Sequence, residues 1–109
     1  MKRVLFICSQ NRLRSPTAEK IYSGTGNIEV RSAGLDSDAV TTVTDELISW
    51  ADIIFIMEKS HQNQLLKKFE AASTGKKIVC LYIPDEYTYM DPHLVQLLRL
   101  RVRAYLGMP

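Results

Sequence analysis

The feature that most constrains the fold is a regular alternation of short apolar runs with amphipathic segments. The apolar runs are rich in β-branched residues and are bounded by polar or turn residues, as buried strands are; they span residues 4–7, 28–31, 53–57 and 78–83. Segments with helical spacing follow at 15–22, at 44–50, from residue 60 and at 92–106. This alternation predicts a three-layer α/β fold, with a four-stranded parallel sheet and helices on both faces. Right-handed crossovers favour the strand order 2-1-3-4.

Two of the predicted helices have the same start signal. Ser15-Pro16 and Asp91-Pro92 each combine a residue that favours the N-cap with a proline that favours the first helical position. The last helix carries an apolar stripe, and Gly107 is expected to end it.

Composition narrows the class of protein. With 109 residues, of which 46% are hydrophobic, the chain suits one domain, residues 1–109, with one substantial core. The net charge of +2 is too small to indicate nucleic-acid binding, and no apolar run approaches the ~18 residues of a membrane span. Two cysteines make neither a disulfide framework nor a metal site, and His61 and His93, read as polar helix-start residues, lack metal-ligand spacing. We therefore expect a cytoplasmic protein.

The chemistry is expected where the first strand ends. In doubly wound sheets ligands bind beyond the carboxyl ends of the strands, at the point where the winding reverses. That point is the segment 8–15, which reads C-x5-R-S between a strand and a helix. Its backbone N–H groups and the positive end of the helix suit a phosphate dianion and a thiolate at Cys8. The predicted phosphate-binding residues are Ser9, Gln10, Asn11, Arg12, Leu13 and Arg14.

This segment could also have no function, with a buried cysteine at a strand end and two solvated arginines. C-x5-R alone would favour that interpretation, because both residues are common. Its position after an apolar strand and before Ser-Pro favours a functional loop instead. The planar fork of Arg14 can hold two phosphate oxygens, which a lysine cannot do.

Several motifs together resemble the low-molecular-weight protein tyrosine phosphatases. The matching stretches run over nearly the whole chain; they are Val-Leu-Phe-Ile-Cys at 4–8 with Asn11 and Arg14-Ser15-Pro16, Ser32-Ala33-Gly34, Ala-Asp-Ile-Ile-Phe-Ile-Met at 51–57, and Asp91-Pro92.

The resemblance implies hydrolysis of a phosphomonoester through a cysteinyl-phosphate, with no metal and no cofactor. It makes Cys8 the nucleophile and Arg14 the clamp. Ser15 would donate a hydrogen bond to the thiolate, and Asn11 and Ser32 would brace the loop. The expected substrate is a phosphotyrosine protein or a small aryl phosphate.

The sequence also departs from the family. Gln10 replaces a usual glycine, Leu13 replaces a frequent second cysteine, and His93-Leu94 replaces a common tyrosine pair. The segment between Gly34 and Ala51 is distinctly shorter than in the family. These departures indicate a shortened bacterial-type member, and they bear on the substrate preference.

The loop before the last helix offers two candidates for the general acid. Asp91 matches the family's acid and is also an expected N-cap, whereas Asp85 is the competitor on the same loop. Asp91 is preferred at this stage. Tyr87 and Tyr89 lie nearby and either form an aromatic wall for a phenyl ring or pack within the loop.

Other functions fit this fold less well. An arsenate reductase needs further cysteines, and only Cys80 is available. A phosphocysteine carrier has no use for Arg14, and a non-catalytic phosphate or phosphopeptide-binding module needs no acid. The last two stay open as alternatives at this point.

Overall fold

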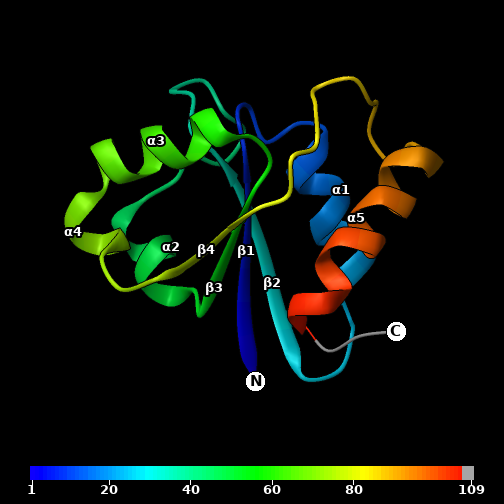
Figure 1. The fold of residues 1–109 in the computed structure, drawn as a ribbon, viewed down its shortest axis with the longest axis horizontal. Coiled ribbons are helices and arrows are strands. Elements are labelled where there is room, and N and C mark those ends of the chain that lie inside the picture. Colours follow the sequence, from blue (N-terminus) through cyan, green and yellow to red (C-terminus); the bar gives the residue numbers. More distant parts are fainter. Residues whose placement is uncertain (107–109) are drawn as a thin grey trace.

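Four parallel strands form the sheet in the order β2-β1-β3-β4, as the sequence predicts (Figure 1). The computed structural model describes residues 1–106. The strands are β1 (Lys2–Cys8), β2 (Ile28–Gly34), β3 (Ile53–Ile56) and β4 (Lys77–Cys80). The winding reverses beside β1, so its carboxyl end, Cys8, lies at the expected switch point.

Helices cover both faces of this sheet. α1 (Arg14–Tyr22) and α5 (Pro92–Leu106) lie on one face, and α2 (Asp45–Trp50), α3 (Lys59–Lys68) and the short α4 (Glu70–Ser73) lie on the other (Figure 1). The sequence did not predict α4. No helix within residues 1–106 is long and apolar enough to cross a bilayer.

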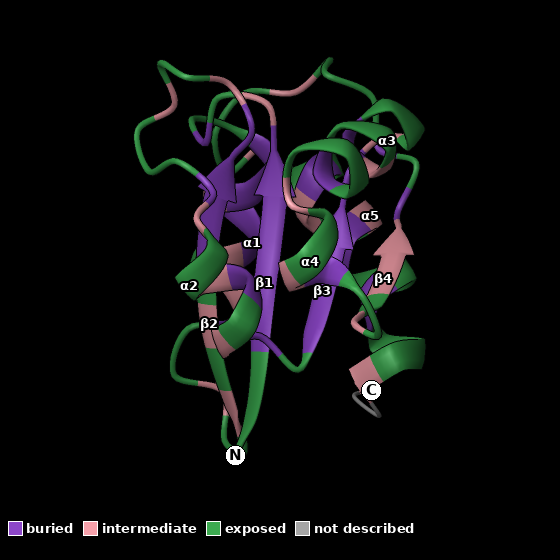
Figure 2. Cartoon of the chain, turned by 90° about the vertical axis from the view of Figure 1, so that its left-hand side faces the viewer, coloured by how far each residue is buried: buried purple, intermediate pink, exposed green. Residues whose placement is uncertain are grey.

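The two sheet faces bury separate cores because side chains alternate along β1. Phe6 and Cys8 point toward α1 and α5, whereas Leu5 and Ile7 point toward α2 and α3. The central strands β1 and β3 are the most buried elements (Figure 2). This packing fixes the end of β1, and with it the position of Cys8.

All four strands differ from their predicted bounds, and the differences are largest at the ends of β2 and β4. β2 continues to Gly34, because its last residues pair in register with the end of β1, Gly34 opposite Cys8. β4 ends at Cys80 instead of residue 83, because Tyr82 adopts a left-handed φ of 53°. The N–H groups of Leu81 and Ile83 nevertheless bond to carbonyls at the end of β3, at 2.8 Å each. The chain after β4 therefore stays attached to the sheet edge that bears the site.

The two predicted helix starts have different outcomes. Asp91 caps α5, since its Oδ1 accepts a hydrogen bond from the His93 N–H at 2.8 Å. Ser15, however, is not the cap of α1: the helix already begins at Arg14, and Leu13 occupies the N-cap position. The Ser15 hydroxyl is instead bound inside the site. Gly107, the expected end of α5, lies outside the described residues.

Gly34 is required by a close approach of two backbone segments. A Cβ at this position would lie 2.5 Å from the carbonyl oxygen of Ser9 and 2.8 Å from the amide nitrogen of Asn11. Both atoms belong to the backbone of the loop after β1, so neither can yield by a change of rotamer. Any side chain here must push that loop away.

We therefore expect Gly34→Ala to lower the free energy of unfolding by about 1–3 kcal/mol, as overpacking does, and to weaken phosphate binding. Urea unfolding and phosphate titration measure the two effects. Gly26→Ala is the matched control, since a Cβ there meets nothing within 4 Å; it should stay within about 0.5 kcal/mol. Equal effects of the two substitutions would contradict the steric argument.

Candidate active site

The loop between β1 and α1 is held from outside by its carbonyl groups. Three consecutive carbonyls accept hydrogen bonds of 2.9–3.1 Å from the segment after β2; the pairs are Leu35 to Cys8, Asp36 to Ser9 and Val40 to Gln10. Each peptide bond here is trans, so its N–H points opposite to its C=O. The N–H groups of Ser9, Gln10 and Asn11 consequently face the inner side of the loop, and that of Asn11 lies 3.2 Å from the Cys8 Sγ.

The beginning of α1 adds further donors. The first intrahelical hydrogen bond runs from the Thr17 N–H to the Leu13 carbonyl, so the N–H groups of Arg14 and Ser15 have no helical partner. Pro16 has no N–H to satisfy. The positive end of the helix dipole therefore points at the same concavity as the loop amides.

Asn11 holds the loop in shape from behind. Its φ of 56° lies in the left-handed region, which asparagine tolerates better than most residues. The side-chain amide donates to the Ser15 Oγ at 3.0 Å and to the Ser32 Oγ at 2.9 Å, and its oxygen accepts from the Thr41 N–H. The structure thus brings together Asn11 and Ser32, the two residues predicted to support the loop.

Cys8 and Ser15 are in direct contact. The Sγ lies 2.9 Å from the Ser15 Oγ, and Cys8 is only 3% exposed. Because Asn11 donates to this hydroxyl, the single Ser15 proton is free for the sulfur or for the Ala33 carbonyl, which is farther away at 3.3 Å. The geometry therefore allows Ser15 to donate a hydrogen bond to a thiolate.

Arg14 is a buried cation that joins the ends of three strands. Its side chain is 2% exposed; Nη1 donates to the Glu58 Oε2 at 2.7 Å and to the Ile83 carbonyl at 2.8 Å. Its Nε lies 3.7 Å from the Asp85 Oδ1. Sequence reasoning missed Glu58, although its position directly after a buried strand was the available signal.

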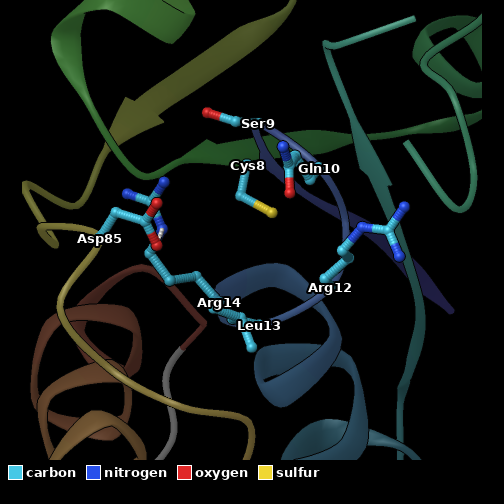
Figure 3. A pocket seen from close by; sticks show the side chains of 7 residues that line it. All are labelled: Cys8, Ser9, Gln10, Arg12, Leu13, Arg14 and Asp85. Carbon is cyan, nitrogen blue, oxygen red and sulfur yellow. Dashed lines mark ion pairs between the residues drawn. The ribbon is translucent and has the colours of Figure 1, made fainter. Parts of the chain in front are cut away.

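A pocket of about 30 Å³ lies beside Cys8. It is lined by Cys8, Ser9, Gln10, Arg12, Leu13, Arg14 and Asp85 (Figure 3). A single water needs about 10–15 Å³, so the pocket suits an anion of a few atoms. Five of the six predicted phosphate-binding residues line it, and Asn11 lies behind it. In Figure 3, Arg14 and Asp85 face each other on one side of Cys8, and Arg12 extends away on the other.

The structure does not bring Asp91 to this pocket. The lining carboxylate is Asp85, six residues earlier, and Asp91 caps α5. The physical reason is that Arg14 binds the carbonyl of Ile83, so only the first part of the loop passes over Cys8. The preference for Asp91 over Asp85 is not supported by this geometry.

The proposed aromatic wall is not supported either. Tyr87 is half-buried against the core beneath α5 and lines a separate groove beside Leu97 and Leu100. Tyr89 is exposed and lies near Pro16. Neither tyrosine is among the residues that line the Cys8 pocket, so loop packing is the better description.

His61 is a buried part of the site that sequence reasoning treated only as a polar helix-start residue. Its place in the first turn of α3 agrees with that reading, but its contacts were not foreseen. Nδ1 accepts the Glu58 N–H at 3.1 Å, so Nε2 carries the proton in its 2.9 Å contact with the Ser9 Oγ. Burial lowers the pKa of His61, and the nearby Arg14 guanidinium lowers it further, against the opposing effect of Glu58. His61 is therefore neutral.

His93 is exposed in the first turn of α5, as expected. Within residues 1–106, no three His, Cys, Asp or Glu side chains are grouped so that they could hold a metal ion.

The comparisons with known proteins support the resemblance stated from the sequence. The family model for low molecular weight phosphotyrosine protein phosphatase matches residues 3–49, which hold Cys8, the loop and Gly34. A search of curated protein sequences found no match.

Solved structures share the fold over almost the whole chain. A YwlE arginine phosphatase from Geobacillus stearothermophilus is 22% identical, with a TM-score of 0.71 and coverage of 98% of this chain and 95% of that one. SP-PTP, a low molecular weight protein tyrosine phosphatase from Streptococcus pyogenes, is 19% identical, with a TM-score of 0.79 and coverage of 98% and 92%. Vibrio vulnificus Wzb, in complex with benzylphosphonate, is 24% identical, with a TM-score of 0.78 and coverage of 97% of both chains. The chain therefore has the fold of the low molecular weight phosphatases.

The lowered pKa of His61 predicts a pH dependence of stability. Because the pKa of His61 is lowered in the folded chain, the unfolded chain binds a proton at His61 more readily below about pH 6.5. The free energy of unfolding is therefore higher at neutral pH and falls as the pH is lowered. Between about pH 7.5 and 5.5, the free energy of unfolding should fall more steeply in the wild type than in His61→Gln. The two slopes can differ by at most about 1.4 kcal/mol per pH unit, the change that one full proton makes.

Urea unfolding at several pH values measures both slopes. Parallel pH profiles of the two proteins would contradict the assignment of a neutral, buried His61.

Proposed function

We propose that this chain, as a single domain over residues 1–109, is a phosphomonoesterase that acts on phosphotyrosine in proteins and on small aryl phosphates. The observation that carries the proposal is the position of the Cys8 Sγ, in a pocket sized for an anion and between the loop amides and Arg14. The fold shared with tyrosine and arginine phosphatases supports it. A reducing, cytoplasmic compartment would suit the two free cysteines.

In the proposed mechanism, the Cys8 thiolate attacks phosphorus and the ester oxygen leaves opposite to it. A bond from sulfur to phosphorus forms as the bond from phosphorus to oxygen breaks, and Asp85 gives its proton to the leaving oxygen. Water then attacks the cysteinyl-phosphate while the Asp85 carboxylate takes a proton from it. Inorganic phosphate and the thiolate are the products.

Arg14 would bind the phosphoryl group through the edge of the guanidinium that carries Nε and Nη2, where the described partner is Asp85, 3.7 Å from Nε. Nη1 is occupied by Glu58 and Ile83, whereas Nε and Nη2 donate no hydrogen bond within residues 1–106. Two parallel N–H donors match two phosphoryl oxygens. Their hydrogen bonds strengthen as charge spreads over those oxygens in the transition state.

Arg12 supports an aryl phosphate over phosphoarginine as the substrate. It lies at the rim of the pocket and is exposed; within residues 1–106 no carboxylate pairs with it, and its one hydrogen bond is to the Asp38 carbonyl at 3.4 Å. A phosphoarginine brings a guanidinium to this rim, and like charges repel there. A phenyl ring carries no such charge.

The test of the function is turnover of p-nitrophenyl phosphate. The wild type should hydrolyse it, and Cys8→Ser should lose at least about 10³-fold in kcat, since a hydroxyl is a far weaker nucleophile than a thiolate. Cys80→Ser is the matched control and should stay within about twofold, because Cys80 lies outside the pocket. Phosphate binding without turnover in the wild type would instead identify a binding module.

The substrate class is tested in the same assay. The wild type should hydrolyse a phosphotyrosine peptide at least about tenfold faster, in kcat/KM, than the same peptide with phosphoarginine. The opposite ranking would refute the tyrosine preference but not the phosphatase activity.

The identity of the acid is tested with two leaving groups. Asp85→Asn should slow phenyl phosphate hydrolysis by roughly 10²-fold or more, the range of a positioned acid, and should slow p-nitrophenyl phosphate less, because its phenolate leaves without a proton. Asp91→Asn should change neither rate much, since asparagine caps a helix as well as aspartate does. If Asp91 carried the leaving-group dependence, the roles of the two residues would be reversed.

A further inference from the structure

The loop that carries Asp85 is held by hydrogen bonds at its two ends. We call residues 84–90 the acid loop. Before it, Ile83 donates its N–H to the Met57 carbonyl and accepts from Arg14, both at 2.8 Å. At its far end, the Met90 N–H donates to the Thr17 Oγ1 at 2.9 Å.

Between these attachments the acid loop has two further contacts: the Asp85 Oδ1 lies 3.7 Å from the Arg14 Nε, and Tyr87 packs against the core. Only Tyr87 is half-buried, and the other residues of the loop are exposed. A local turn closes it, with the Asp91 N–H bonded to the Thr88 carbonyl at 3.1 Å. The position of the exposed Asp85 over Cys8 therefore depends on this long ion pair with Arg14 and on the two ends of the loop.

Thr17 is placed to hold the far end. Its side chain is fully buried, and its hydroxyl proton goes to the Leu13 carbonyl at 2.7 Å, which leaves its oxygen to accept the Met90 N–H. Leu13 is the last residue of the loop between β1 and α1, residues 9–13, which we call the nucleophile loop. One hydroxyl thus joins the nucleophile loop, α1 and the acid loop.

Arg14 and Thr17 are three residues apart and so share one face of α1. Arg14 binds the near end of the acid loop and Thr17 the far end. Met90 has a left-handed φ of 60°, a conformation that costs free energy and needs such a contact to persist.

We propose that Thr17 is a positioning residue, which fixes Asp85 over Cys8 through the Met90 N–H. The proposal rests on the proposed role of Asp85 as the acid. Thr17 touches no reacting atom; without its hydroxyl, the far end of the acid loop is released and Asp85 spends less time within reach of the leaving oxygen.

The test is Thr17→Val, which keeps the shape of the side chain and removes the hydroxyl. We expect kcat/KM for phenyl phosphate to fall about tenfold, the order expected for the loss of one hydrogen bond, and that for p-nitrophenyl phosphate to fall less. Thr17→Ser should restore most of the loss. The control is Thr74→Val, since the Thr74 hydroxyl also bonds a carbonyl four residues earlier but touches no loop of the site.

A double-substitution cycle separates positioning from general damage. In an Asp85→Asn background, Thr17→Val should cause little further loss, because the acid it positions is gone. Equal losses for the two substrates, or a full additional loss in that background, would overturn the proposal. A wild type without turnover would instead refute the proposed function.

Amide hydrogen exchange of the wild type supplies a measurement that needs no variant. The Met90 amide should exchange much more slowly than those of Glu86 and Tyr89, for which the structure shows no hydrogen bond within residues 1–106. A Met90 amide that exchanges as fast as these would overturn the proposal even if Thr17→Val failed to fold.

Discussion

The site depends on the orientation of three peptide planes. The carbonyls of residues 8–10 are bound by the segment that follows β2, and the trans geometry of each peptide then turns the next N–H inward. The same arrangement forces β2 and the loop so close together that residue 34 must be glycine. The proposed anion site thus depends on hydrogen bonds that the loop makes on its outer side.

The second constraint is the burial of a guanidinium. A cation that is 2% exposed needs partners, and Arg14 finds them in Glu58 after β3 and in Ile83 and Asp85 after β4. These contacts draw the ends of two strands toward the loop after β1. Arg14 therefore has both a structural and a proposed catalytic part. Nη1 makes the hydrogen bonds to Glu58 and Ile83, and the edge with Nε and Nη2 is proposed to bind the phosphoryl group.

The segment between Gly34 and α2, although short, binds the outer side of the loop between β1 and α1. It supplies the N–H groups of Leu35, Asp36 and Val40 to the nucleophile loop, and it leads into a helix of six residues. It contributes no residue to the lining of the Cys8 pocket, whose rim is formed by Gln10, Arg12, Leu13 and Asp85. A substrate of the proposed phosphatase would therefore be recognised mainly by the nucleophile loop and the acid loop.

The sequence by itself determined the strand order, the two helical layers and the loop that holds Cys8, Arg14 and Ser15. Those features depend on local periodicity and on handedness rules that apply to every βαβ unit. Only the tertiary structure decided which carboxylates reach the loop. Glu58, His61 and Asp85 are 44 to 71 residues from their partners Arg14 and Ser9 in the chain.

Asp85 and Asp91 show why the sequence alone could not identify the carboxylate that lies at the pocket. Both residues lie next to proline in the segment before the last helix. Their positions in the sequence do not show which carboxylate lies near Cys8 in the folded chain. The decision came from the attachment of Ile83 to Arg14 and of Met90 to Thr17, which lays the first part of the loop over the pocket and leaves Asp91 to cap α5. Such contacts join groups far apart in sequence, so no local pattern encodes them.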